Sequence, residues 1–449
     1  MKTTNKLFTK TYLDIFTPLI IEQFFLTLIA NFNVFLFSLF NDQMVAAIGI
    51  SDQLLNIFAM ITNIVVLGAT ILIIQNADKS RIDYVKQILK ESAILNIIIA
   101  IIIVIVVFAF NKNLLSFMQT PAELLYETSV YIRIVSVSII FLAMTSLMLA
   151  SLRAFGHVRI AVRVSVANTL LVILGNSIIV IFGLGGIAYI ALATLISRLI
   201  GMIITFVTLR YYIPELFERT GNRQKFGLSK DILGLGFPSA MEQISYNFSQ
   251  TIITAIIASL GTLAVSSKIY TQTITAFIFS IGVAGAVAGQ IIIGNYLRHG
   301  KIEKIKTFGV LNPNRISLIA AGINLIIAIF GRFIVRIFTD DPVIIDTVTT
   351  LLFFQVLLDP MRVSNEILIS SLNVLKDVRF PVMVAILTTY LLVIPLAYLS
   401  VNKLGMGLKA VWIVFILDET LRRILLTRRF KSGKWMAAND TENQGKTVL

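Results

Sequence analysis

Long apolar stretches separated by short polar gaps run along almost the whole chain. Twelve of them reach or approach the roughly 20 residues that an α-helix needs to cross a bilayer. We therefore predict an all-α membrane protein with twelve transmembrane helices. The predicted spans are 15–40, 48–75, 92–110, 125–152, 163–183, 187–210, 233–259, 264–293, 313–336, 343–372, 381–401 and 406–427.

Lysine and arginine gather in every second gap between the predicted spans. The gap after the second span contains Lys79, Arg81, Lys86 and Lys90, and similar clusters follow the fourth, sixth, eighth, tenth and twelfth spans. Short loops rich in Lys and Arg remain in the cytoplasm. We therefore expect a multi-pass protein of the plasma membrane, with its N- and C-termini in the cytoplasm.

The sequence contains an internal repeat. The pattern Pro-x-x-x-Glu-Gln begins at Pro18 and again at Pro238, 220 residues later, and other similar segments recur at about the same offset. Six spans is an even number, so two such repeats would run parallel, related by an axis along the membrane normal. We predict two pseudo-symmetric six-helix bundles at residues 1–210 and 233–435, a cytoplasmic linker at 211–232, and a polar tail at 436–449.

Composition agrees with a membrane protein and excludes several other classes. Of the 449 residues, 57% are hydrophobic and only 14% are charged, whereas soluble domains carry about 25% charged residues. The formal charge of +14 does not indicate a nucleic-acid partner, because the basic residues lie in the gaps between spans. The chain has no cysteine, which excludes disulfides and thiolate metal sites. We expect the bilayer and a small-molecule substrate as partners, and a monomer.

Polar residues inside the spans are the candidate site residues, because a charge at mid-bilayer costs several kcal/mol and is functional by default. Glu22 and Glu242 have no obvious cationic neighbour in their own helices. Asp359 and Arg362 could equally be a helix-packing pair, and the amides could be interhelical glue. We interpret Asp418, Glu419, Arg422 and Arg423 as charges that snorkel toward the cytoplasmic surface. The substrate and ion-coupling candidates are Glu22, Asn33, Asp52, Asn168, Asn176, Glu242, Tyr246, Asn247, Gln250, Lys268, Gln272, Asp359, Arg362, Asn365 and Glu366.

These residues favour a secondary transporter. A buried carboxylate can hold a proton, a sodium ion or a cationic substrate in turn, and competition for one negative site is a simple route to antiport. The sequence has no nucleotide-binding motif and no nucleophile–base or metal-ligand constellation, so we predict neither an enzyme nor a cofactor. Coupling would then depend on H⁺ or Na⁺, and a sodium ion could bind near Glu22 and Asp52.

A series of short motifs occurs in a fixed order along the chain. They are Pro18-x-x-x-Glu22, Ala46-Ala47-Ile48-Gly49, Leu152-Arg153-Ala154-Phe155-Gly156, Pro238-Ser-Ala-x-Glu242, Lys268-x-Tyr270-Thr271, Asp359-Pro-x-Arg362-x-x-Asn365, Asp377-Val-Arg-Phe380-Pro381 and Asp418-Glu419-x-x-Arg422. In their order and spacing the chain resembles the multidrug and toxic compound extrusion (MATE) family over nearly its whole length, most closely a branch common among Gram-positive bacteria. The resemblance implies a V-shaped pair of six-helix bundles that exports drugs or metabolites against sodium or proton entry. It points to Glu22, Glu242, Asn247, Asp359 and Arg362.

The sequence departs from the family pattern at one position. Many relatives carry an Asp where this chain has Asn33, and an amide cannot take up a proton or lend sodium a full charge. Asp52 could supply the missing charge. An alternative function is a flippase for lipid-linked saccharides or metabolites, which would need cations for a pyrophosphate; Arg133, Arg198, Lys268 and Arg362 are candidates. Neither the substrate nor the choice between sodium and proton follows from the sequence.

Overall fold

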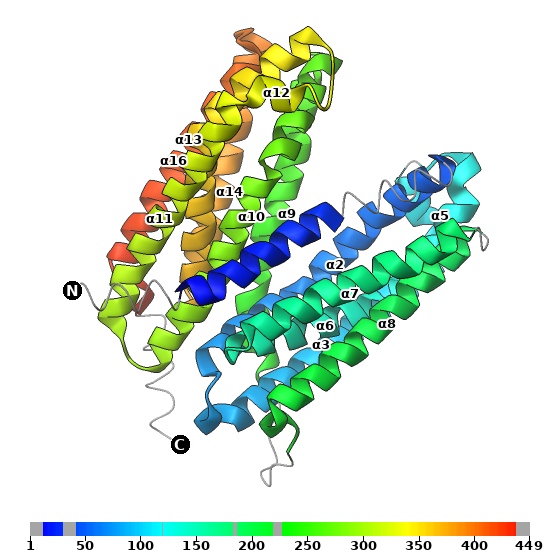
Figure 1. The fold of residues 1–449 in the computed structure, drawn as a ribbon, viewed down its shortest axis with the longest axis vertical. Coiled ribbons are helices and arrows are strands. Elements are labelled where there is room, and N and C mark those ends of the chain that lie inside the picture. The colour runs from blue at the N-terminus through cyan, green and yellow to red at the C-terminus, as the bar shows by residue number, and fades with distance from the viewer. Residues whose placement is uncertain (1–11, 30–41, 119, 183–185, 219–226, 437–449) are drawn as a thin grey trace. The chain divides into compact units, whose positions relative to one another are not determined.

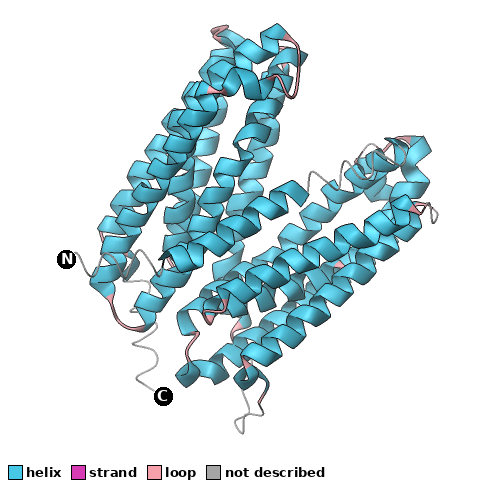
Figure 2. Ribbon diagram, viewed as in Figure 1, coloured by secondary structure: helices cyan, strands magenta, loops and turns pink. Residues whose placement is uncertain are grey.

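The described part of the chain is helical throughout (Figures 1 and 2). The computed structural model describes residues 12–29, 42–118, 120–182, 186–218 and 227–436. Ten helices in these ranges are long and apolar enough to cross a membrane. Two further long helices, α9 (Ser229–Ala258) and α16 (Gly407–Lys431), are less apolar because polar and charged residues interrupt them. These two helices contribute most of the candidate site described below.

Contacts divide the chain into two compact units. The N-terminal unit comprises Phe24–Ala240. In it α2 packs against α3, α5 and α6, and α8 packs against α5, α6 and α7. Its buried core is aliphatic, with Ile103, Ile132 and Ile190 among its members. The helices are α2 (Asp42–Asn76), α3 (Ile82–Ala109), α4 (Asn111–Phe117), α5 (Leu125–Val137), α6 (Ile139–Ala154), α7 (Val158–Ile181) and α8 (Ile187–Tyr212).

The C-terminal unit comprises Met241–Leu449 together with Met1–Gln23. Helix α13 lies at its centre and packs against α10, α11, α12 and α16. The end of α9 joins this unit through Ile253, Ile256 and Ile257, which pack with α13 and α16. The helices are α10 (Thr262–Arg298), α11 (Ile302–Ile329), α12 (Gly331–Val335), α13 (Pro342–Val374), α14 (Arg379–Thr388), α15 (Ile394–Tyr398) and α16.

The unit boundary falls inside α9, between Ala240 and Met241. A second boundary falls inside the helix Tyr12–Ile29, between Gln23 and Phe24. The predicted bundles at 1–210 and 233–435 and the linker at 211–232 stay predictions. The helix that begins each repeat therefore has one part in each unit.

Local irregularities interrupt three of the predicted spans. The span predicted at 125–152 is two helices, and Ser138 lies at the break between α5 and α6. The span predicted at 313–336 is likewise divided at Phe330, between α11 and α12. Near the span predicted at 381–401, two wide π-helical turns, Thr389–Val393 and Leu399–Lys403, lie on either side of α15, and the second extends two residues past that span. Pro395 lies in α15 and has no backbone N–H to donate, which favours a widened turn before it. Such turns are frequent at functional sites.

Candidate functional site

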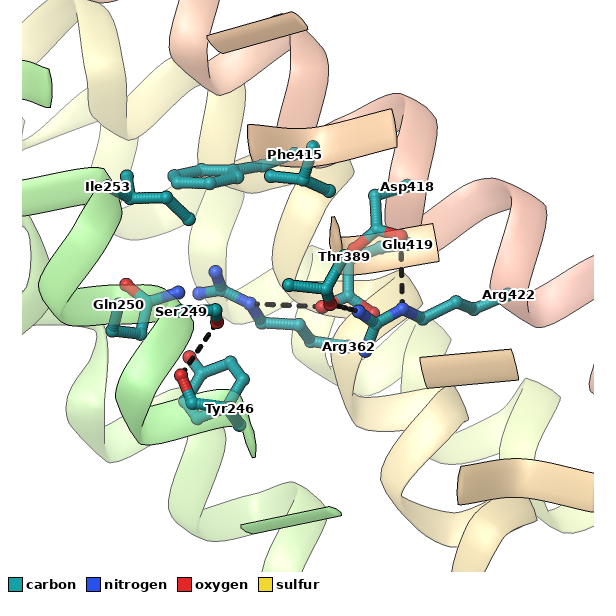
Figure 3. A pocket seen from close by; sticks show the side chains of 11 residues that line it. Tyr246, Ser249, Gln250, Ile253, Arg362, Thr389, Phe415, Asp418, Glu419 and Arg422 are labelled. Carbon is teal, nitrogen blue, oxygen red and sulfur yellow. Dashed lines mark hydrogen bonds and ion pairs between the residues drawn. The ribbon is translucent and has the colours of Figure 1, made fainter. Parts of the chain in front are cut away.

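A small pocket lies within the C-terminal unit, between α9, α13, α16 and the π turn Thr389–Val393 (Figure 3). Four of its lining side chains are charged. Buried charges in a membrane bundle need partners or a function. The lining residues are Tyr246, Ser249, Gln250, Ile253, Arg362, Thr389, Val393, Phe415, Asp418, Glu419 and Arg422.

Arg362 links two helices through two loose ion pairs. Its Nη1 lies 3.8 Å from Asp359 Oδ1 on the same helix, and its Nε lies 3.5 Å from Glu419 Oε1 on α16. The guanidinium also lies over the ring of Phe415, 5.9 Å from the ring centroid. Because both ion-pair distances exceed that of a good charge-assisted hydrogen bond, Arg362 is held weakly by each acid.

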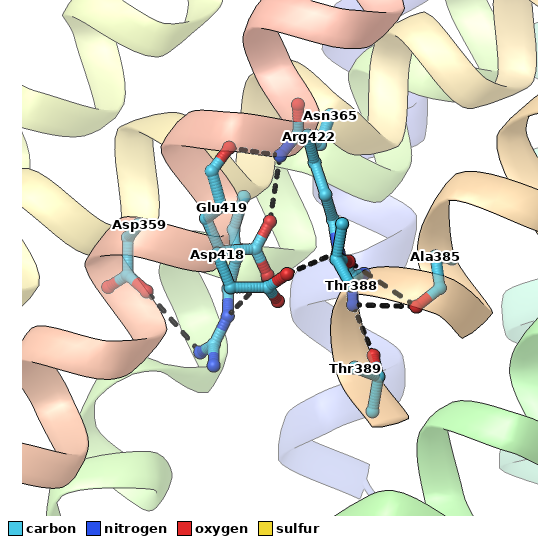
Figure 4. A network of polar contacts seen from close by, with 9 residues as sticks. Asp359, Asn365, Ala385, Thr388, Thr389, Asp418, Glu419 and Arg422 are labelled. Atoms are coloured by element: carbon cyan, nitrogen blue, oxygen red, sulfur yellow. Dashed lines mark hydrogen bonds and ion pairs between the residues drawn. The ribbon is translucent and has the colours of Figure 1, made fainter. Parts of the chain in front are cut away.

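Arg422 is held much more tightly (Figure 4). Its Nε donates to Asp418 Oδ1 at 3.0 Å and to Thr388 Oγ1 at 2.9 Å. Its Nη2 donates to the carbonyl of Ala385 at 3.2 Å and to Thr389 Oγ1. This arginine therefore fastens α16 to the start of the π turn and fixes Thr389 in the pocket wall.

Asn365 adds a third tie between α13 and α16. Its Nδ2 donates to both the backbone carbonyl and Oε2 of Glu419, each at 2.8 Å. Asp359 is buried, and its Oδ2 has no hydrogen-bond partner among the residues that the structure describes. A buried, half-satisfied carboxylate carries an energetic cost that a bound cation or a proton would remove.

Carboxylates outnumber the arginines that neutralise them. Arg362 serves both Asp359 and Glu419. Arg422 is paired with Asp418, and Glu242 on α9 is near enough to feel its charge. A third cation, the buried Lys268, donates to the neutral hydroxyl of Thr254 and forms no ion pair with the acids that the structure describes. Glu366 on α13 adds a further acid. Among the described residues in and near the pocket, these five acids outnumber the three cations, although the two acids and two arginines of the lining itself balance.

Some of the predicted site residues of α9 line the pocket, and the predicted residues of α10 do not. Tyr246 and Gln250 line it. Asn247 is exposed and donates to the carbonyl of Gln243 in its own helix, at 2.9 Å. Lys268 is only 3% exposed, and Gln272 is half-buried one turn further along α10. Neither of these α10 residues lines the pocket.

The amides predicted on α7 join helices within the N-terminal unit. Asn168 Nδ2 donates to Thr205 Oγ1 of α8 at 2.9 Å. Asn176 Oδ1 accepts from Thr194 Oγ1 of α8 at 3.1 Å. These contacts match the interhelical-glue interpretation of membrane amides, although a role in transport stays a prediction.

The remaining candidates of the first repeat are Asp52 in the N-terminal unit, Glu22 in the C-terminal unit, and Asn33. Asp52 is exposed on α2, and Arg198, which donates to Ser138 Oγ at 2.7 Å, is near enough to feel its charge. Glu22 is buried and belongs to the C-terminal unit. Asn33 lies outside the described residues. A sodium site near Glu22 and Asp52 stays a prediction, and the described residues contain no group of three or more His, Cys, Asp or Glu side chains suited to a metal.

The burial of the two acids and Arg422 of α16 differs from the prediction. Asp418, Glu419 and Arg422 were expected to snorkel, but they are only 5%, 7% and 8% exposed and line the pocket. Snorkelling residues keep their charged ends in water, so that interpretation is wrong. Their position eleven or more residues into the predicted span 406–427, with Asp418 and Arg422 one turn apart, was a usable signal.

The MatE family profile matches this chain twice, over residues 18–178 and 238–399. The two matches start 220 residues apart, which is the offset of the internal repeat. Together they cover well over half of the chain. The duplication predicted from the two Pro-x-x-x-Glu-Gln segments therefore extends over most of each half.

Curated relatives match along almost the entire sequence. The uncharacterised transporter YisQ of Bacillus subtilis is 33% identical over 426 residues, which are 93% of this chain and 93% of YisQ. The probable multidrug resistance protein NorM of Thermotoga maritima is 25% identical over 402 residues, covering 87% of this chain and 85% of NorM.

Solved structures share the fold. An outward-facing multidrug resistance MATE family transporter of the MOP superfamily superposes with a TM-score of 0.83, at 19% identity and 96% coverage of each chain. A MOP superfamily transporter from Pyrococcus furiosus, described as having a binding pocket of reverse polarity, gives a TM-score of 0.80 at 19% identity, over 94% of this chain and 95% of its own. Taken with the family profile and YisQ, this multi-pass, all-helical membrane protein belongs to the MATE family of transporters.

Proposed function

We propose that the chain is a secondary active antiporter that exports cationic or amphipathic small molecules in exchange for entering H⁺ or Na⁺. The observation that carries the proposal is the surplus of carboxylates around the pocket of the C-terminal unit. Asp359 and Glu419 share one guanidinium, at 3.8 Å and 3.5 Å. A cation that binds to one of these two acids therefore leaves the other acid paired with Arg362.

Antiport follows from competition between the substrate and the coupling ion for these carboxylates. When H⁺ or Na⁺ neutralises a carboxylate beside Arg362, the pocket loses its attraction for a cationic substrate. When the substrate occupies the pocket, the coupling ion is excluded. Each ligand shifts the equilibrium between transport states only through its differential affinity for them, so mutual exclusion is what ties the two fluxes together.

The pocket also offers apolar and aromatic surface for an amphipathic substrate. Ile253 and Val393 are aliphatic, and Phe415 and Tyr246 present rings. Tyr246 is 41% exposed, so part of its ring is free to stack. Aromatic faces attract organic cations when water is excluded. The name of the NorM relative, a probable multidrug resistance protein, supports the same class of substrate.

The flippase alternative has weaker support from the pocket. A pyrophosphate would need free cations, whereas Arg422 already donates to four acceptors and Arg362 faces two acids. Binding an anion would require these pairs to break, at a cost of several kcal/mol for each carboxylate left buried alone.

Efflux from liposomes tests the proposal. The purified protein is reconstituted, a cationic dye is loaded, and an inward sodium gradient or an inward proton gradient is imposed in turn. We expect one of the two gradients to accelerate dye efflux and its dissipation to stop it. Efflux of the dye that ignores both gradients would contradict the antiport proposal, and transport of a lipid-linked saccharide without dye transport would favour the flippase.

A further inference from the structure

Helix α9 is continuous, but its two ends belong to different units. Residues up to Ala240 pack within the N-terminal unit, and residues from Met241 pack within the C-terminal unit. The second part carries Tyr246, Ser249 and Gln250 to the pocket. The contacts made by the first part therefore fix the position at which this helix, which forms one pocket wall, begins.

The start of α9 is capped by an acid from another helix. Glu91 of α3 is only 2% exposed. Its Oε1 accepts from the backbone N–H of Gly227 at 3.1 Å, and its Oε2 accepts from Ser229 Oγ at 2.9 Å. Gln87 supports it with a further hydrogen bond of 3.1 Å. A carboxylate at a helix N-terminus satisfies free N–H groups and complements the helix dipole.

The first part of α9 also crosses α2 at a pair of glycines. A Cβ at Gly236 would lie 1.8 Å from the carbonyl oxygen of Ile64, and a Cβ at Gly68 would lie 1.9 Å from that of Ile232. The contact is reciprocal. Gly236 faces the carbonyl of Ile64, one turn before Gly68, and Gly68 faces the carbonyl of Ile232, one turn before Gly236. Only glycine permits backbones to approach this closely, as in the small-residue crossings of membrane helices.

Pro238 follows these contacts directly and precedes the unit boundary. A proline inside a helix removes one backbone hydrogen bond and weakens that turn. Beyond it, Ile253, Ile256 and Ile257 hold the second part in the core of the C-terminal unit. Both parts of α9 are thus anchored independently, and the weakest turn lies between the anchors.

We propose that Glu91, Gly68 and Gly236 are positioning residues that clamp the first part of α9 to the N-terminal unit throughout the transport cycle. The turn at Pro238 is then the joint through which the two units act on each other. Bending of α9 at this turn would displace the pocket face that starts at Tyr246.

Hydrogen exchange tests the clamp without relying on transport. Gly236→Ala adds a methyl group against Ile64, whereas Gly234→Ala adds one on the same helix where nothing lies within 4 Å. We expect Gly236→Ala to speed exchange of the 229–240 amides by about tenfold or more and to leave 241–258 unchanged, because each part opens separately. Gly234→Ala should change neither. Acceleration along all of α9, or none in 229–240, would overturn the proposal; if Gly236→Ala fails to fold, Glu91→Gln is compared in the same way.

A cross-link distinguishes a clamp that persists from a contact that opens. The chain has no cysteine, so Glu91→Cys with Ser229→Cys gives a unique pair that a short, reducible bis-methanethiosulfonate can bridge. We expect the bridged protein to transport at least as fast as the unbridged pair, since the bridge replaces the lost cap. Transport that stops on bridging and resumes on reduction would show that this contact opens during the cycle and would refute the clamp.

Discussion

The two arginines of the pocket differ in how firmly they are held. Arg422 donates to four acceptors, including Asp418 at 3.0 Å and Thr388 at 2.9 Å. Among the residues that the structure describes, Arg362 has its ion pairs at 3.5 Å and 3.8 Å and the ring of Phe415. A side chain with many short bonds fixes structure, and one with weak bonds can exchange partners. We therefore expect Arg422 to serve mainly the structure and Arg362 to serve transport.

Loss of Arg422 should unfold the protein more readily. In Arg422→Gln, Asp418 would remain buried without its cation, which typically costs about 3–5 kcal/mol. We expect a clearly lower midpoint of thermal unfolding in detergent. Arg332→Gln is the control, because Arg332 and Asp346 are both mostly exposed and such surface pairs contribute about 0–1 kcal/mol. Equal midpoints for the two variants would contradict the structural duty.

Neutralising Asp359 should impair transport rather than folding. Asp359→Asn keeps the shape but removes one of the two acids beside Arg362. We expect gradient-driven dye efflux to fall by about tenfold or more, the size of one lost charge-assisted contact, with little change in thermal stability. Asp346→Asn, at an exposed pair, is the matched control. Unchanged efflux by Asp359→Asn would remove this acid from the coupling site.

The Asp52 hypothesis is tested by the same kind of variant. If Asp52 supplies the charge that Asn33 lacks, Asp52→Asn should abolish the dependence of efflux on the ion gradient. Efflux that keeps its full gradient dependence would show that Asp52 is not the replacement. Arg198, in the same unit, is near enough to interact with the charge of Asp52, so Asp52 has a cationic neighbour besides any coupling ion.

At the scale of the helices, the sequence predicts apolar stretches well, and charged helix starts and interruptions poorly. The apolar period predicts α8 and α13 to within two residues at each end. Helices α3 and α11 begin ten and eleven residues before the predicted spans 92–110 and 313–336, because their first turns carry charged residues that the apolar period excludes. The break at Ser138 and the two π turns are not visible in that period. Neighbouring helices bond at or near two of these places, since Arg198 donates to the Ser138 hydroxyl and Arg422 donates to the Ala385 carbonyl just before the first π turn.

A close helix contact elsewhere in the C-terminal unit makes a stability prediction. A Cβ on Gly309 of α11 would lie 2.0 Å from the ring of Phe430, which is fully buried beside Trp435. Gly309→Ala should destabilise the protein by about 1–3 kcal/mol through overpacking. On the same helix Gly322 has nothing within 4 Å, so Gly322→Ala should gain up to about 1 kcal/mol of helix propensity. Chemical denaturation that ranks the two variants in the opposite order would contradict the packing described here.

At the scale of the whole molecule, the two repeats can be compared through the polar contacts of their described residues. Both carry the Pro-x-x-x-Glu-Gln start and both match the MatE profile. In the described residues, the second half gathers Arg362, Glu419 and Arg422 around one pocket. In the first half, Asn168 and Asn176 bond to hydroxyls of α8. The sequence predicted the candidates, but only the contacts separate those that meet in a pocket from those that tie helices together.

Equilibrium binding of a cationic dye to the purified protein tests the central claim most directly. If substrate and coupling ion compete for the surplus carboxylates, dye affinity must fall as either sodium or proton concentration rises, and by linkage the dye must weaken binding of that same ion equally. Asp359→Asn should weaken dye binding and flatten this dependence. Dye affinity that is independent of both sodium and pH in the unmodified protein would contradict competition for the carboxylates.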